Sequence, residues 1–145
     1  MAWSVSGWYA DTLKQEFAED IALDLELDTH KLALYNNSLT PDFSAVDPQY
    51  SSTNEVSGTG YTAGGSAVTG TTLASTGGYL TWDGDNVSWT SSTITGVQGG
   101  IIYADSLTSN NLIIGIYFGG TTYATNDGTL LVSWAGTGIG RFDVS

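Results

Sequence analysis

The hydrophobic and polar positions of this chain change their spacing along its length, from a helical period near the start to alternation. Leu13, Phe17 and Ile21 recur every four residues, so one amphipathic helix is predicted over residues 7–21. Ser6 or Asp11 is expected to cap it. Residues 23–28 then alternate leucines with acids, which predicts a strand. Asp28-Thr29-His30 should form a turn, and residues 31–35 should continue the alternation.

The second half reads as short β-strands separated by turn signals rich in Gly, Asn and Asp. Strands are expected near 67–74, 78–83, 86–90, 93–104, 111–119, 128–135 and 140–144. Connections this short permit antiparallel pairing only. The continuous apolar runs at 101–102 and 112–118 predict central strands buried on both faces. We therefore expect a mainly β protein, an antiparallel β-sandwich or jelly-roll-like barrel with one short N-terminal helix, forming one domain over 1–145.

A long loop is predicted between these halves, over residues 36–65. It holds both prolines and many small polar residues, and it is longer than ordinary connections. Such loops often bind partners, so the apolar residues along it are candidate partner-binding residues: Phe43, Val46, Tyr50 and Tyr61. Two interpretations stay open. The residues dock on another protein, or they pin the loop to its own domain, with Tyr61 as an anchor.

Charge narrows the classes of partner. Three Lys and Arg against fifteen Asp and Glu give a net charge of −12, which repels nucleic acid and anionic lipid. The absence of Cys excludes disulfides and thiolate metal sites. No apolar run approaches the roughly 20 residues that span a bilayer, and the first residues show no secretion signal. We expect no nucleic-acid and no membrane partner.

Candidate chemistry is sparse in this sequence. The glycines of residues 58–65 loosely resemble a dinucleotide-binding loop, but a β-type run follows them where that motif needs a helix. The acids of residues 24–28 invite a calcium site, yet alternate strand residues lie too far apart to share one ion. Asp83-Gly84-Asp85-Asn86 is better explained as a hairpin turn, with Trp82 and Trp89 paired across it.

Catalysis is not expected either. His30 is the one histidine, it lies in a predicted turn, and no nucleophile motif accompanies it. We expect no enzyme, no catalytic residue, no cofactor and no metal. A carbohydrate-binding β-sandwich remains an alternative, since Trp82, Trp89 and Trp134 could stack on sugar rings.

One segment carries a family resemblance. Asn54-Glu55-Val56-Ser57-Gly58-Thr59-Gly60-Tyr61-Thr62-Ala63-Gly64-Gly65 resembles a stretch of small virion structural proteins of tailed bacteriophages. Segments 31–35, 38–43, 87–89 and 131–134 resemble other parts of that family, so the likeness runs from about residue 10 to the end.

The resemblance implies localisation in the virion. Our first choice is a capsid decoration (cement) protein on the outer surface of the major capsid shell. A tail or neck component is the alternative. The implied partners are the major capsid protein or other virion proteins, and further copies of the chain in a homo-oligomer, with a trimer favoured because virion positions repeat by symmetry.

Overall fold

The computed structural model describes residues 3–27 and 29–144, and it is mainly β with one short helix. The helix is α1 (Ala10–Phe17). The strands are β1 (Gly7–Trp8), β2 (His30–Tyr35), β3 (Gly58–Thr59), β4 (Ser66–Val68), β5 (Thr72–Thr76), β6 (Tyr79–Asp83), β7 (Val87–Ile94), β8 (Gly99–Ala104), β9 (Leu112–Tyr117), β10 (Gly128–Val132) and β11 (Gly140–Asp143). Every strand pair among the described residues is antiparallel, as the short connections predict.

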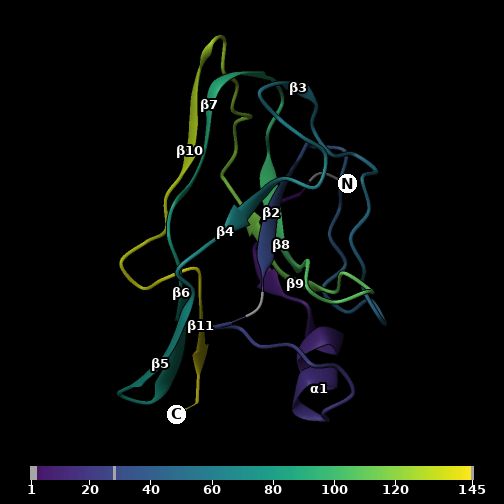
Figure 1. Cartoon of the computed structure of the whole chain (residues 1–145), viewed down its shortest axis with the longest axis vertical. Helices are drawn as coiled ribbons and strands as arrows, with labels where there is room; N and C mark the ends of the chain where they lie inside the picture. Colours follow the sequence, from purple (N-terminus) through teal and green to yellow (C-terminus); the bar gives the residue numbers. More distant parts are fainter. Residues whose placement is uncertain (1–2, 28, 145) are drawn as a thin grey trace.

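The strands form a sandwich of two layers (Figure 1). One layer is a five-stranded sheet in the order β1-β9-β8-β2-β4. The other consists of two three-stranded sheets, β10-β7-β3 and β11-β6-β5, which follow one another along the opposite side. The helix α1 lies at the lower end of the five-stranded sheet in Figure 1. The expected β-sandwich with a short N-terminal helix is therefore confirmed.

The core fills the space between the layers, and a second apolar cluster covers the outer face of the five-stranded sheet. Alternate residues of β2 divide between them, because Leu32 and Leu34 face the core while Ala33 and Tyr35 face outward. β8 is buried along its whole length, as its continuous apolar sequence predicts. The outer cluster consists of Trp3, Tyr9, Ala33, Tyr35, Ile101 and Tyr103.

The helix is shorter than predicted and has a different cap. Gly7 and Trp8 form β1, which pairs with β9, and α1 begins only at Ala10. The N-cap position is occupied by Tyr9 without a side-chain cap. The backbone N–H and C=O groups of β1 bond to β9, and a longer helix would need the same groups. Tertiary pairing therefore overrides the local helical pattern. The phenyl ring of Phe17, expected on the apolar stripe, is 78% exposed.

The predicted strand at 23–28 is wrong over its described residues. Asp24 Oδ1 accepts the backbone N–H groups of Glu26 at 2.9 Å and Leu27 at 3.1 Å, which closes a turn. Leu23 is buried in the core, whereas Leu27 is 84% exposed. Asp28 lies outside the described residues.

His30 is also misplaced by the sequence prediction, since it begins β2 and is fully buried. Its ring meets Trp82 edge-on, at 5.4 Å between centroids.

Two predicted strands are broken and one predicted hairpin is wrong. The strand expected at 67–74 divides into β4 and β5, and the one at 93–104 is interrupted before β8. β6 and β7 do not pair, because the turn between them passes from one three-stranded sheet to the other. Trp82 and Trp89 therefore are not cross-strand partners. Instead Thr69 holds the turn between β6 and β7. Its carbonyl accepts the N–H of Asp85 at 2.8 Å, and its hydroxyl donates to the Asp85 carboxylate at 2.9 Å.

Candidate docking surface

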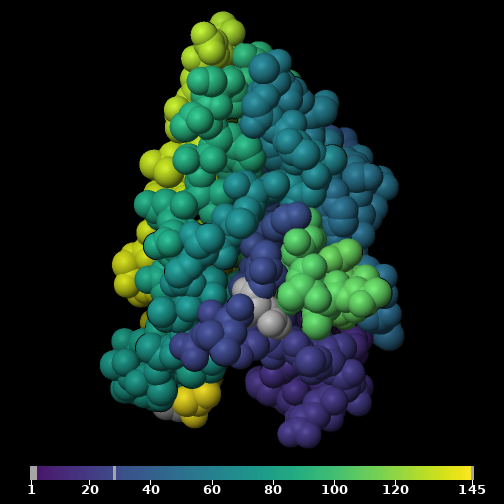
Figure 2. Space-filling view, in the orientation of Figure 1, coloured from purple at the N-terminus to yellow at the C-terminus, as the bar shows by residue number. Residues whose placement is uncertain are grey.

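Residues 36–55 of the predicted loop fold back over the outer face of the five-stranded sheet. Gly58–Thr59 instead form β3, which pairs with β7 in the opposite layer, and Tyr61 packs against the core. Isolated bridges join Tyr35 to Glu55 and Gln49 to Asn111, so the middle of the loop is attached to the sheet at two points. Figure 2 shows its blue-to-teal surface on the right of the molecule. Hydrogen bonds and ring stacking attach the aromatic residues of this loop to the sheet.

Glu55 is the centre of that attachment. Its Oε2 accepts the hydroxyl of Tyr50 at 2.6 Å, while its Oε1 accepts the hydroxyl of Tyr61 at 2.5 Å and the backbone N–H of Gly64 at 2.8 Å. We call these four residues the Glu55 clamp. The hydroxyl of Tyr61 also accepts the N–H of Leu34 at 2.9 Å, which ties the clamp to β2. Hydrogen bonds to a carboxylate are stronger than those between neutral groups, so one acid organises the segment.

Tyrosine rings extend the clamp into the outer cluster. Tyr50 stacks on Tyr103, with centroids 4.6 Å apart, and the hydroxyl of Tyr103 donates to the carbonyl of Gly64 at 2.8 Å. Burial, followed by the hydrogen bond to Glu55, raises the pKa of both Tyr50 and Tyr61. Burial, with Asp105 and Glu55 nearby, raises the pKa of Tyr103 to about 12. These phenols therefore remain neutral hydrogen-bond donors at physiological pH.

Gly65 explains why the segment needs glycine. Its φ is +78°, and a Cβ placed there would lie 1.8 Å from the carbonyl oxygen of Leu32. The loop backbone therefore approaches β2 more closely than any side chain would allow. The strand β4 follows where a dinucleotide site would need a helix, and the amide of Gly64 already serves Glu55. The segment is built as a close-packed attachment.

The four predicted partner-binding residues have different environments. Phe43 is half-buried, with its ring 5.1 Å from that of Tyr9, and Tyr50 and Tyr61 belong to the Glu55 clamp. These three rings attach the loop to its own domain. Val46 alone projects into solvent, at 85% exposure. The structure thus brings Tyr50 and Tyr61 together and leaves Val46 apart.

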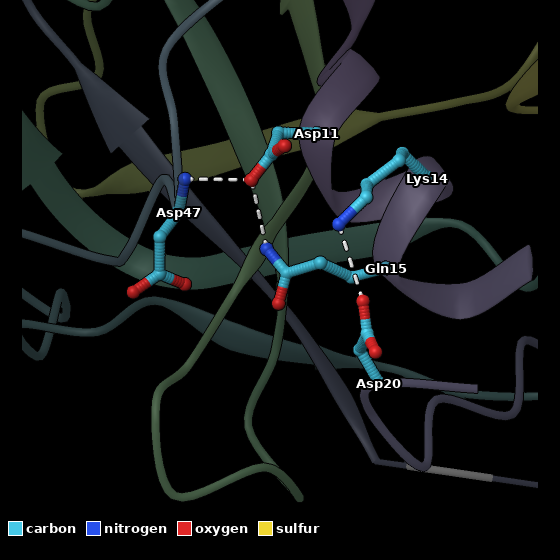
Figure 3. A network of polar contacts seen from close by, with 5 residues as sticks. All are labelled: Asp11, Lys14, Gln15, Asp20 and Asp47. Carbon is cyan, nitrogen blue, oxygen red and sulfur yellow. Dashed lines mark hydrogen bonds and ion pairs between the residues drawn. The ribbon is translucent and has the colours of Figure 1, made fainter. Parts of the chain in front are cut away.

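A polar network holds the backbone at Asp47, the residue after Val46, against α1 (Figure 3). Asp11 Oδ2 accepts the backbone N–H of Asp47 at 2.8 Å and the Nε2 of Gln15 at 2.9 Å. The hydrogen bond from Asp47, and then that from Gln15, lowers the pKa of the Asp11 carboxyl. Asp47 Oδ1 in turn accepts the Nδ2 of the buried Asn111 at 3.2 Å. Asp11 thus secures the loop instead of capping α1.

A hollow of about 280 Å³ opens beside this part of the loop. Apolar side chains form much of its lining, among them Tyr35, Leu39, Pro41, Ala45, Pro48 and Leu112. We call Val46 together with this hollow the Val46 surface. It combines a projecting apolar side chain with a recess, and both are presented on a fixed backbone.

Two of the three tryptophans considered for sugar stacking are buried, and the third is half-buried. Trp82 is fully buried, and its Nε1 donates to the carbonyl of Leu25 at 2.8 Å. Trp89 is 5% exposed and lies against Tyr61. Trp134 is half-buried, with its Nε1 donating to the carbonyl of Asp85 at 2.9 Å. Neither Trp82 nor Trp89 offers a free ring face to a sugar.

Within residues 3–27 and 29–144, no three His, Asp or Glu side chains are grouped to hold a metal ion. The acids considered as calcium ligands accept backbone N–H groups instead. The Glu26 carboxylate accepts the N–H of Leu73 at 2.9 Å, and the Asp83 carboxylate accepts the N–H of Gly84 at 2.9 Å. The described helix is too short and too polar to cross a bilayer.

Fold and site define the class of this protein as an acidic antiparallel β-sandwich whose outer face is covered by a clamped loop. Comparisons of the chain with protein-family models, curated proteins and solved structures found no match.

Glu55 is the residue of this surface that the sequence pattern did not single out, although it accepts three hydrogen bonds there. A signal was present, because Glu55 is the one charged residue between Asp47 and Asp83 and has a tyrosine on either side. An isolated acid in an uncharged aromatic stretch is typical of a hydrogen-bonded carboxylate inside the fold.

Proposed function

We propose that this protein is a structural component of a tailed bacteriophage virion. Its first-choice position is that of a capsid decoration (cement) protein on the outer surface of the major capsid shell, and a tail or neck position is the alternative. The observation that carries the proposal is the Glu55 clamp, because it gives a structural purpose to the residues 54–65 that resemble the virion family.

The Val46 surface is the proposed contact with the major capsid protein. Its turn is secured by Asp11 and Asn111, so little conformational entropy is lost when a partner docks. A small apolar contact then suffices, because each bound copy repeats at every symmetric position and linked copies reinforce one another. Self-association of the protein belongs to the same proposal.

Charge supports a position away from the packaged genome. A net charge of −12 with three cationic residues repels DNA phosphates. An outer surface satisfies this constraint, and so does a tail position.

The experiment is addition of purified protein to particles that lack it, followed by sedimentation. Val46→Asp should fold normally, as judged by circular dichroism, and fail to co-sediment, because it places a charge in an apolar contact. Val144→Asp is the matched control, since Val144 is equally apolar, 76% exposed and located after β11. This control should bind as the unaltered protein does.

Full incorporation of Val46→Asp would show that this surface is not the contact. Absence of the unaltered protein from purified particles would overturn the virion role itself. A reconstruction of the particle then distinguishes the capsid shell from the tail or neck.

A further inference from the structure

The charge of this protein is distributed unevenly over the fold. Residues 86–140, which contain β7 to β10, hold only two charged residues, Asp105 and Asp127. Asp105 is paired with Lys31 at 3.1 Å. Most acids therefore lie elsewhere, and the strands β7 to β10, which belong to both layers, contain no charged residue in a protein of net charge −12.

This uncharged region includes an unpaired strand edge. Among the described residues, β10 pairs with β7 alone and ends its sheet. It lies on the outside of the molecule in Figure 1. Leu131 projects from it at 58% exposure, whereas Val132 faces the core. An edge of this kind presents backbone N–H and C=O groups that another strand can pair with.

A groove of about 420 Å³ runs beside the same edge. It is lined by apolar and aromatic side chains from the end of β9 and from the chain around β10, with no charged residue: Ile116, Tyr117, Phe118, Tyr123, Leu131 and Trp134 among others. Hydrogen bonds fix its wall, because Trp134 binds the carbonyl of Asp85 through Nε1 and the side chain of Asn86 through its backbone N–H. Tyr123 donates to the carbonyl of Phe118 at 3.1 Å. The groove is thus already formed in one copy.

We propose that this edge and groove are the interface between two copies of the chain. β10 pairs antiparallel with β10 of the second copy, which joins two three-stranded sheets into one of six, and the two grooves close over each other. Antiparallel pairing of identical strands is two-fold symmetric, so one patch serves both copies.

Electrostatics identifies a second copy as the occupant. Two molecules of net charge −12 repel each other in most orientations, whereas β10 and the lining of its groove contain no charged residue and can approach an identical surface. β5, another strand that ends a sheet, is less suitable, because its side chains are mostly short and polar and the N–H of Leu73 is already bound to Glu26.

The contact is small, so the pair should dissociate on dilution. This inference does not rest on the virion role. It specifies a two-fold pair, where the sequence favoured a trimer.

Sedimentation velocity across a range of concentrations tests the proposal. The unaltered protein should move from monomer to dimer as concentration rises, whereas Leu131→Asp should remain a folded monomer. Ser75→Asp is the matched control, since it adds the same charge at an exposed position of the β5 edge. It should still dimerise, and so should Val46→Asp, which separates this interface from the proposed capsid contact.

A mixing experiment keeps the test independent of folding. Leu131→Lys and Leu131→Asp should each be monomeric and should form a mixed dimer when combined, because opposite charges then meet near the two-fold axis. The proposal is overturned by an unaltered protein that is monomeric or trimeric at every concentration, or by a Leu131→Asp variant that dimerises as tightly as the unaltered protein. Monomers whose β10 edge instead captures a peptide from another virion protein also overturn it.

Discussion

Replacing Glu55 by alanine should be among the most damaging single changes outside the core. The substitution removes the acceptor of three hydrogen bonds, from the hydroxyls of Tyr50 and Tyr61 and from the N–H of Gly64. A hydrogen bond to a charged group contributes about 1.5–3 kcal/mol, and bonds that share one acceptor do not add fully. We therefore expect the free energy of unfolding to fall by about 3–5 kcal/mol, a large part of a typical total of roughly 5–15 kcal/mol.

The two tyrosines should differ in a way that the geometry dictates. Tyr61→Phe removes a donor to Glu55 and also the acceptor of the Leu34 N–H, so a loss of about 2 kcal/mol is expected. Tyr50→Phe removes one hydrogen bond to the carboxylate and keeps the stacking on Tyr103, so about 1.5 kcal/mol is expected.

Urea unfolding, followed by circular dichroism and tryptophan fluorescence, measures these losses. The decisive result is the coupling between positions. In the Glu55→Ala background, Tyr50→Phe should cost almost nothing, because its acceptor is already gone. If Glu55→Ala unfolds within about 1 kcal/mol of the unaltered protein, or Tyr50→Phe costs the same in both backgrounds, the clamp does not hold the loop.

Two further outcomes follow from the same region. Burial raises the pKa of five tyrosines above the ordinary 10.0: Tyr9, Tyr35, Tyr50, Tyr61 and Tyr103. Below pH 10.0 these groups should not change the free energy of unfolding. Above pH 10.0 the free energy of unfolding should fall, because the unfolded chain ionises them while the folded chain keeps them neutral. Absorbance of tyrosinate should show them ionising together with loss of dichroism, and their ionisation in a fully folded protein would contradict this. Gly65→Ala should abolish folding or cost more than about 3 kcal/mol, because its Cβ would meet the backbone of Leu32. Gly96→Ala, at a similar φ of +73° with nothing within 4 Å, should cost only about 1–2 kcal/mol in thermal or urea unfolding, and equal losses would refute the contact.

The sequence predicted those elements whose pattern has one physical explanation. The apolar pair Ile101 and Ile102 was expected to be covered on both faces, and the structure buries both residues. The antiparallel sandwich followed from short connections. The Gly77-Gly78 turn joins β5 and β6 as a hairpin, since both glycines take the positive φ that such a turn needs.

Alternation failed at residues 23–27, because a strand needs a partner as well as a pattern. β2, the next strand, already pairs with β4 and β8 on its two sides. The segment instead turns on the carboxylate of Asp24, which supplies hydrogen bonds locally. In the same way, the helical period of residues 7–21 does not predict that Gly7 and Trp8 pair with β9.

The candidate site was predictable as a loop but not as a clamp. Its length and prolines are local properties, whereas the hydrogen bonds that Leu34 donates to Tyr61 and Asp47 donates to Asp11 join residues far apart in sequence. Phe43 and Val46 are both apolar residues of this loop, and only the fold shows that one packs on Tyr9 while the other faces water.

The two proposed surfaces require partners of different chemistry, because their charges differ. Val46 shares its loop with Asp42 and Asp47, and Asp11 accepts the N–H of Asp47. Hydrogen bonds lower the pKa of the Asp42 and Asp11 carboxyls, so these charges persist in mild acid. A protein that docks there must place cationic or neutral groups around an apolar centre. The β10 edge lies in the chain's uncharged region, and it can meet an identical copy without opposing like charges. Neither surface can therefore substitute for the other, and a single copy can use both at once.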